Sequence, residues 1–272
     1  MIANLLRPPE RAIIAGFVLA IWTGAILLIL PEASDGRPLS LIDALFTSTS
    51  ATCVTGLTVI DTGSRLSLFG QLIVLTLIQI GGLGIMTIST MFIVVMGKRP
   101  SLTDMVAVQD TLMLRPERGF HFILRDVAIM TAIIEGAGFL MIFFYLLLNT
   151  NFSPLSSLYV AVFHAISAFC NAGFSLFSDS LMEFQRSYFL NFVICLLIIM
   201  GGIGFLVLSE LRDKRSFSAL SLHSKLVIST TAILLVLGSL LITFMEWNNT
   251  MECLSIPHKF LAGFFQSVSS RT

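Results

Sequence analysis

The sequence predicts an all-α, polytopic membrane protein that is built from a repeated unit. Its 272 residues are 56% hydrophobic and only 12% charged, and the mean hydropathy is +0.92. Soluble globular domains carry about 25% charged residues. Five apolar segments are long enough to cross a membrane, and two shorter ones between them each end in a glycine turn. The apolar composition makes the lipid bilayer an expected partner, and the zero net charge argues against nucleic acid.

The five long segments meet the roughly 20 residues that a membrane-spanning helix needs. They cover residues 12–30, 69–96, 127–148, 188–208 and 226–245. Eleven of the 16 lysines and arginines lie before the first span, between the second and third, or between the fourth and fifth. The positive-inside rule assigns these stretches to the cytoplasm. We therefore expect a multi-pass protein of the cell inner membrane with a cytoplasmic amino terminus and both glycine turns entering from outside.

The segments after the first and third spans predict re-entrant half-helices. Residues 39–52 and 155–169 carry apolar residues at helical spacing, but each is too short to span a bilayer. We expect Ser40 to cap the first half-helix, and Ser156 or Ser157 to cap the second.

Internal comparison relates the two half-helices and their turns. Five residues recur at a constant offset of 117: Phe46 and Phe163, Ser50 and Ser167, Ala51 and Ala168, Cys53 and Cys170, and Gly56 and Gly173. A glycine cluster in each following span recurs at an offset of 120: Gly81, Gly82 and Gly84, then Gly201, Gly202 and Gly204. For these clusters we favour close helix packing, with a gating hinge as the alternative.

The repeat unit is therefore span, half-helix, glycine turn and span. The first repeat, with a cytosolic linker, covers residues 1–110, and the second covers residues 111–222. A third begins in residues 223–272, where residues 256–270 resemble its half-helix. We expect this third repeat to end before the glycine of its turn.

The two turns predict a path for a monovalent cation. Non-helical backbone at membrane depth is tolerated only where protein buries it or where it lines a water-filled path. A half-helix that enters from outside leaves its carboxyl end, with about half a negative elementary charge, near mid-membrane. Gly56 and Gly173 accept positive φ and let backbones converge, so carbonyl oxygens can replace the hydration shell of a potassium ion. No acidic residue adjoins either turn, which argues against a divalent-cation site.

We expect an ion filter at both turns and at the end of the third half-helix. The predicted filter residues are Thr52, Cys53, Val54, Thr55, Gly56, Cys170, Asn171, Ala172, Gly173, Ser270, Arg271 and Thr272. Asn171 is expected to brace its turn. Glu135, an ionisable residue inside a span, is expected to bond a polar neighbour, with ion attraction as the alternative. Asp61, Asp179 and Glu183 are candidates to attract cations in an outer vestibule, with ordinary solvated loop charges as the alternative.

These motifs resemble the Trk/Ktr/HKT superfamily of potassium transporters, and most of all the bacterial Ktr-type pore-forming membrane subunit. The resemblance covers essentially the whole chain and is most specific in residues 43–57, 79–87 and 171–179, while residues 265–272 resemble the approach to a third filter. It implies four repeats around a pseudo-fourfold pore, with potassium as the transported ion and sodium as a candidate coupling ion in symport. It also implies a homodimer and a cytosolic nucleotide-binding regulatory subunit.

The resemblance further implies that the pore is incomplete in this chain. Two repeats and most of a third are present, and the third filter glycine would fall one or two residues beyond Thr272. We therefore expect the chain to be the amino-terminal fragment of a longer protein.

Other chemistries have little support in the sequence. There is no phosphate-binding loop and no catalytic constellation, so we do not expect an enzyme. The four cysteines lack metal-ligand spacing, so we expect no structural metal site and no covalently bound cofactor. Two alternatives to ion uptake stay open: a broken-helix secondary transporter of an organic solute, and a non-conducting membrane fragment.

Overall fold

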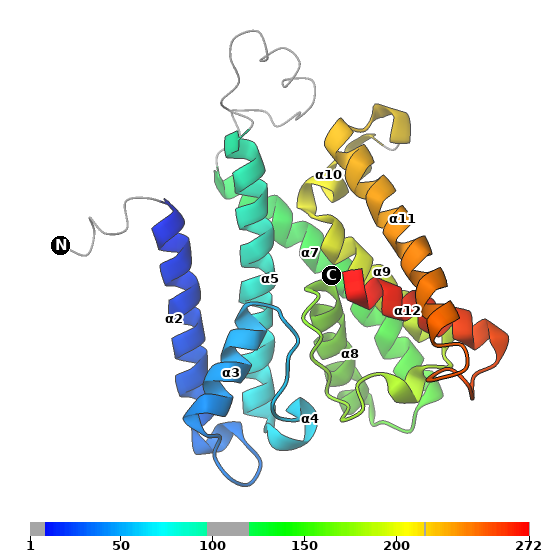
Figure 1. The fold of residues 1–272 in the computed structure, drawn as a ribbon. Coiled ribbons are helices and arrows are strands. Elements are labelled where there is room, and N and C mark those ends of the chain that lie inside the picture. Colours follow the sequence, from blue (N-terminus) through cyan, green and yellow to red (C-terminus); the bar gives the residue numbers. More distant parts are fainter. Residues whose placement is uncertain (1–8, 97–119, 215, 272) are drawn as a thin grey trace.

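The computed structural model describes residues 9–96, 120–214 and 216–271, and its named elements are all helices. The predicted all-α fold class is thus confirmed. Figure 1 shows three successive groups of helices, α2–α5, α7–α10 and α11–α12. The boundary that we predicted between residues 110 and 111 lies outside the described residues, as does Thr272.

The first group holds one short helix between two long ones. In chain order its elements are α2 (Pro9–Ile29), η1 (Pro31–Ala33), α3 (Leu41–Thr52), α4 (Thr62–Arg65) and α5 (Leu68–Met96). The half-helix α3 packs against both α2 and α5. The predicted cap of α3 is confirmed, because the Ser40 hydroxyl accepts a hydrogen bond from the Asp43 N–H at 3.1 Å.

The second group repeats this arrangement. It contains α7 (Phe120–Asn149), α8 (Pro154–Phe169), η2 (Met182–Phe184), α9 (Tyr188–Ile203) and α10 (Phe205–Lys214). The predicted cap of α8 was wrong, because Ser153 rather than Ser156 or Ser157 caps it and accepts from the Ser156 N–H at 3.2 Å. The reason is Pro154, whose fixed φ and missing N–H suit the first position of a helix.

The fourth predicted span, residues 188–208, is broken. Helix α9 ends at Ile203, α10 begins at Phe205, and the two helices are bent by 101°. Gly204 joins them with a φ of 92°, a conformation that glycine adopts without the penalty of a side chain. After the bend, the α10 side chains Val207 and Leu208 are buried.

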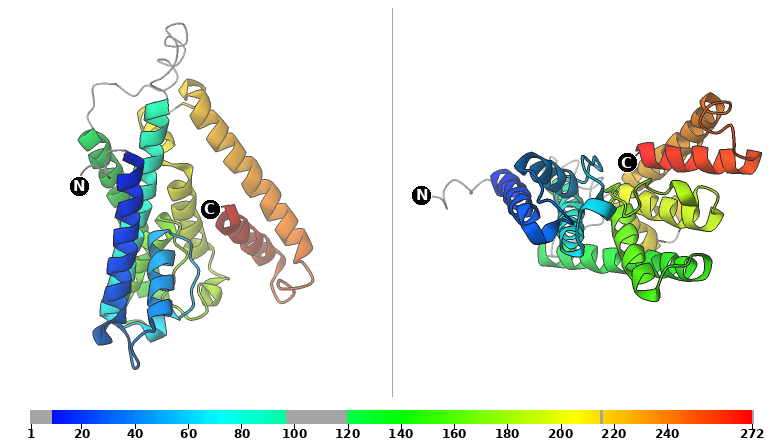
Figure 2. Two further views of the ribbon diagram at one scale, coloured as in Figure 1. Left: turned by 60° about the vertical axis from the view of Figure 1, so that its left-hand side comes forward. Right: turned by 90° about the horizontal axis from the view of Figure 1, so that it is seen from below.

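The third group contains η3 (Phe217–Ala219), α11 (Leu222–Met245) and α12 (Ile256–Arg271). Glu210 links α10 to the start of α11, because its carboxylate accepts a hydrogen bond from the Ser221 N–H at 2.7 Å. The same carboxylate also accepts from Lys214 Nζ, within α10, at 2.7 Å. Helix α12 packs on α11 and α9. Viewed from below in Figure 2, the three groups lie around the turns that follow α3 and α8, and α12 points its carboxyl end toward them.

Two of the described helical segments are long and apolar enough to cross a membrane, Arg125–Asn149 and Leu222–Met245, and the bent pair α9–α10 would be a third. Within the residues searched, α2 and α5 contribute shorter apolar stretches, Ile14–Ile29 and Leu68–Gly84. Large apolar side chains such as Ile133 remain exposed on the long helices. Such a surface suits contact with lipid, in which apolar side chains lose nothing by exposure.

One hydrophobic core joins the first two groups and includes the fully buried Phe163, Phe169 and Ile78. A smaller cluster around Cys195, Leu235 and Val268 attaches the third group to α9. The half-helices are therefore held between long helices, so the turns at their carboxyl ends have fixed positions.

Candidate functional site

The two half-helices end in the same hydrogen-bonded turn. After α3, the Thr55 N–H donates to the Ser50 carbonyl at 3.0 Å, and the Val54 N–H donates to the Ala51 carbonyl at 3.3 Å. This pair of bonds is a Schellman motif, which satisfies the last free carbonyls of a helix. After α8, the corresponding bonds join Ala172 to Ser167 at 2.8 Å and Asn171 to Ala168 at 3.1 Å.

Both turns hold their backbone in the left-handed region at two positions. The φ angles are 57° at Val54 and 74° at Gly56 in the first turn, and 59° at Asn171 and 71° at Gly173 in the second. Positive φ is strained for a β-branched residue such as Val54. Such strain persists only where the surroundings fix the conformation, and it gathers at functional sites.

The structure brings the two turns into direct backbone contact. A Cβ atom at Gly56 would lie 2.8 Å from the Ala172 carbonyl oxygen and 3.3 Å from the Gly173 Cα. A Cβ at Gly173 would lie 3.2 Å from the Gly56 Cα. A side chain at either position would therefore push the two turns apart.

A second pair of glycines lets the following long helices approach the half-helix ends. A Cβ at Gly81 would overlap the Thr52 carbonyl, and one at Gly201 would overlap the Phe169 carbonyl. Thr52 and Phe169 are the last residues of α3 and α8. The close packing that we favoured for the glycine clusters is present at these two positions.

The remaining cluster glycines differ from one another. A Cβ at Gly82 would lie 2.6 Å from Cys170 Sγ, and one at Gly84 would lie 3.4 Å from the Phe17 ring. Both are packing positions. Gly204, in contrast, is the break between α9 and α10, so the sequence repeat does not carry over to the backbone there.

Asn171 and Arg271 both bond the peptide groups of Gly202. In the orientation that satisfies its neighbours, the Asn171 amide nitrogen donates to the Ile198 carbonyl at 3.0 Å, and its oxygen accepts from the Gly202 N–H at 3.2 Å. Arg271 donates to the Gly202 carbonyl at 3.4 Å and to Thr231 Oγ1 at 2.8 Å. The Asn171 side chain thus braces its turn against α9, and the Arg271 side chain is engaged by α9 and α11.

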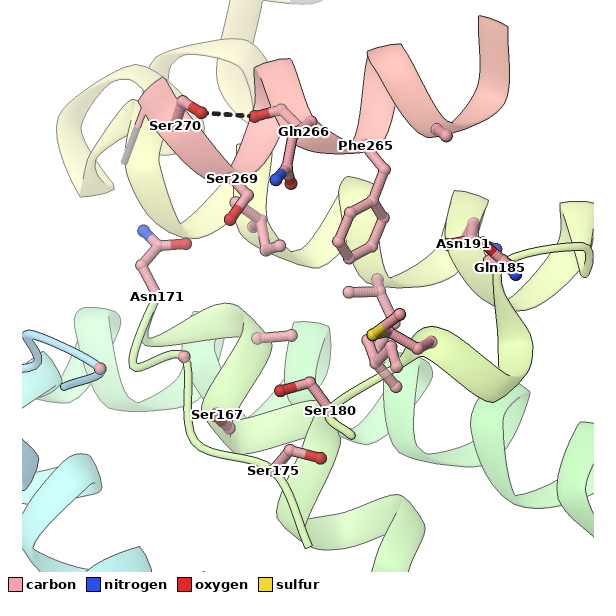
Figure 3. A pocket seen from close by; sticks show the side chains of 18 of the residues that line it. Ser167, Asn171, Ser175, Ser180, Gln185, Asn191, Phe265, Gln266, Ser269 and Ser270 are labelled. Carbon is pink, nitrogen blue, oxygen red and sulfur yellow. Dashed lines mark hydrogen bonds between the residues drawn. The ribbon is translucent and has the colours of Figure 1, made fainter. Parts of the chain in front are cut away.

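All three half-helix ends line one cavity of about 1110 Å³. Figure 3 shows α12 on one side of it and the second turn with Asn171 on the other. The first turn contributes Val54, Thr55 and Gly56; the second contributes Asn171 and Gly173; α12 contributes Ser269 and Ser270. The other predicted filter residues within the described part of the chain do not line this cavity: Thr52, Cys53, Cys170, Ala172 and Arg271.

The cavity lining mixes apolar side chains with hydroxyl and amide groups, and it is nearly uncharged. Among its described residues Glu246 is the one carboxylate, and there is no lysine or arginine. One Glu246 oxygen accepts from Asn249 Nδ2 and Thr250 Oγ1, both at 2.9 Å. Sequence reasoning missed Glu246, although it directly follows the last residue of a predicted span. Hydroxyl, amide and carbonyl oxygens without cationic neighbours suit a weakly bound cation.

The acidic residues that are candidates for an outer vestibule do not line this cavity. Asp61, Asp179 and Glu183 are not among the cavity-lining residues. Asp61 instead caps α4, accepting from the N–H groups of Gly63 at 2.8 Å and Ser64 at 3.1 Å. A hydrogen bond from the Ser178 hydroxyl, supported by these N–H groups, holds the pKa of Asp61 below its ordinary value.

We expect Asp61→Ala to destabilise the protein by about 1 kcal/mol, because α4 loses its cap. Asp61→Asn keeps a capping oxygen and should cost less. Because the folded-state pKa is lowered, the stabilisation by Asp61 is complete above about pH 4 and is lost as the pH falls through that lowered pKa. Thermal unfolding in detergent at pH 7 and pH 3 tests this, and equal destabilisation by Asp61→Ala at both values would contradict it.

Glu135 has the polar neighbours that we expected for it. Gln79 Nε2 in α5 donates to one Glu135 oxygen at 3.2 Å. The other oxygen lies 3.8 Å from Sγ of Cys170, the residue that directly follows α8. Glu135 therefore faces protein and lies directly behind the second turn.

Comparison with known proteins agrees with this architecture. A family model described as TrkH, cation transport protein, matches residues 13–272. The Ktr system potassium uptake protein B of Bacillus subtilis is 41% identical over 266 residues, which are 97% of this chain and 59% of that protein. The potassium/sodium uptake protein NtpJ of Enterococcus hirae is 36% identical over 270 residues, covering 97% of this chain and 58% of that protein. The chain thus spans under two thirds of the length of these relatives.

A solved structure shows the same fold. The potassium transporter TrkH from Vibrio parahaemolyticus matches with a TM-score of 0.61 and 19% identity, covering 93% of this chain and 50% of that one. The family model covers nearly the whole sequence and the helical architecture agrees with it. The chain belongs to the TrkH cation transport protein family.

Proposed function

We propose that this chain forms part of a potassium-selective uptake pathway, in which backbone oxygens of the two glycine turns contact the ion. The observation that carries this proposal is the convergence of three half-helix carboxyl ends on one cavity without lysine or arginine in its lining. Each carboxyl end contributes the negative end of a helix dipole. An anionic substrate would require the opposite ends of these helices to face the cavity.

The ion contacts that we propose centre on the residues that line the cavity. In the first turn these are Val54, Thr55 and Gly56, and in the second they are Asn171 and Gly173. The Thr52 carbonyl packs against Gly81, so its oxygen is the least suited of the predicted set. Full coordination of the ion requires oxygens beyond those of the two turns, because two turns cover only part of an ion's coordination sphere.

The proposed function also includes a cytoplasmic face of the protein and the protein's partners. The basic residues around α10 support a cytoplasmic location for the α10–α11 connection and for the amino end of α2. Arg212 and Asp213 form an exposed ion pair at 3.1 Å on this face. We propose that a cytosolic nucleotide-binding regulatory subunit docks there, that the complete protein is a homodimer, and that sodium is the coupling ion.

Rubidium uptake tests the proposed transport. Bacteria that lack their own potassium uptake systems should take up rubidium when they express the protein from its own gene. Unlabelled potassium should compete at concentrations at least about tenfold lower than sodium does. Competition by amino acids instead of potassium would indicate an organic-solute transporter, and absence of uptake with normal membrane insertion would indicate a non-conducting protein.

A further inference from the structure

A closed set of polar contacts lies behind the second turn, outside the cavity lining. The side chains of Gln79, Glu135 and Cys170 make these contacts, and Gly82 packs against Cys170. We call these four residues the Cys170 clamp. Gln79 Nε2 donates to Glu135 Oε2 at 3.2 Å, and Cys170 Sγ lies 3.8 Å from both Gln79 Oε1 and Glu135 Oε1. Each of these three side chains therefore contacts the other two.

The clamp joins two repeats at one residue of the second turn. Gln79 and Gly82 belong to α5 of the first group, whereas Glu135 belongs to α7 of the second. Cys170 directly follows the last residue of α8, is only 6% exposed, and immediately precedes Asn171, which lines the cavity. Gly82 makes room for the thiol, because a Cβ there would lie 2.6 Å from Sγ.

The first turn has no such attachment within the described residues. Cys53 corresponds to Cys170 at the offset of 117, yet it is exposed and its thiol makes no hydrogen bond to the described residues. Packing alone does not explain a carboxylate at this depth, because an ionisable group inside a membrane protein is costly unless it has a role and partners. The partners of Glu135 are Gln79 and Cys170; Cys170 belongs to the second filter turn, and neither residue lines the cavity.

We propose that Gln79 and Glu135 are positioning residues that set the location of the second filter turn through Cys170, and thereby the selectivity among alkali cations. This inference rests on the proposed function. The hydrogen bonds, rather than the charge of Glu135, hold the turn. A shift of the Cys170 backbone would move the oxygens next to it, and carbonyl placement decides which ion sheds its water.

Two variants of Glu135 separate geometry from charge. Glu135→Gln keeps the shape and one oxygen acceptor, so competition by sodium against rubidium uptake should stay within about twofold of the parent protein. Glu135→Leu removes both polar contacts of this residue, those to Gln79 and to Cys170, so sodium should compete about tenfold better. Equal loss of selectivity in both variants would show that the charge matters and overturn the positioning role. Unchanged selectivity in both would overturn it as well.

A matched control lies at the same boundary between repeats. Tyr159 Oη donates to Gln71 Oε1 at 2.9 Å, linking α8 to α5 without contacting the turn. Tyr159→Phe removes this bond and should leave selectivity unchanged. If it changes selectivity as much as Glu135→Leu does, any loosening of the boundary suffices and the clamp has no special role.

Thiol modification tests the clamp without relying on transport. With Cys53, Cys195 and Cys253 replaced by alanine, Cys170 is the remaining thiol of these 272 residues, and any cysteine outside them is replaced as well. N-ethylmaleimide should modify it slowly in membrane vesicles, and about tenfold faster after Gln79→Ala or Glu135→Leu. Equal rates in parent and variants would overturn the clamp even if uptake is normal. Absence of uptake with the expected thiol rates would instead overturn the proposed function alone.

Discussion

Replacing Gly201 by alanine is expected to lower the melting temperature of the purified protein by about 6 to 10 °C, equivalent to about 3 kcal/mol. A Cβ at this position would overlap the carbonyl oxygen of Phe169, the last residue of α8. Both partners are backbone within packed helices, so no side-chain rotation relieves the overlap. Helix α9 must move away from α8, and the core between them opens.

Gly16→Ala is the matched control for this substitution. Gly16 is also helical, in α2, but nothing lies within 4 Å of a Cβ built there. Alanine is a better helix former than glycine, so the melting temperature should stay the same or rise slightly. Thermal unfolding in detergent micelles measures both variants. Equal melting temperatures for Gly201→Ala and Gly16→Ala would mean that the close approach of α8 and α9 contributes little.

Gly81→Ala extends the same test to the first repeat. A Cβ at Gly81 would overlap the Thr52 carbonyl, at the position that corresponds to Gly201 and Phe169. The two substitutions are expected to lower the melting temperature by similar amounts, because both disturb the packing of a half-helix end against the long helix that follows it.

The sequence predicts the half-helices and close packing at the glycine clusters, because both depend on local signals. Apolar periodicity and length marked α3 and α8 as half-helices, and the two offsets paired Gly56 with Gly173 and Gly81 with Gly201. The TrkH family comparison confirmed the resemblance that these motifs indicated. The contact between the two turns depends on the same glycines, whereas their role as an ion filter stays a proposal.

The break at Gly204 could not be predicted in this way. Gly84 occupies the matching place in the first cluster, and there the helix continues to Met96. The two clusters read almost alike, so local preference does not distinguish them. In the structure α10 packs against α5, α9 and α11, and its side chains Val207 and Leu208 are buried. Contacts of this kind join residues far apart in the chain and leave no periodic signal.

Glu246 and the Cys170 clamp illustrate the same limit at the site. Glu246 lines the cavity because of where α11 ends in space, which its sequence neighbours do not reveal. Glu135 was recognisable as an unusual residue inside a span, but its partners Gln79 and Cys170 lie 56 and 35 residues away. A single sequence predicts that such a carboxylate needs a partner and does not identify which one.

Replacing Gly56 by serine is expected to impair discrimination between potassium and sodium about tenfold in rubidium-uptake competition. Gly56 has a φ of 74°, and a Cβ there would lie 2.8 Å from the Ala172 carbonyl oxygen. A side chain therefore both strains its own turn and displaces the second. The oxygens of the two turns would separate, and a wider, more hydrated site favours potassium less.

Gly36→Ser separates strain from displacement. Gly36 has an even larger φ of 99°, but nothing lies within 4 Å of a Cβ built there. Both serine variants bear the penalty of positive φ, whereas Gly56→Ser alone adds a collision with the second turn. Selectivity should therefore change in Gly56→Ser and stay unchanged in Gly36→Ser. If Gly56→Ser reaches the membrane, transports rubidium and discriminates as well as the parent protein, the contact between the two turns does not define the ion site.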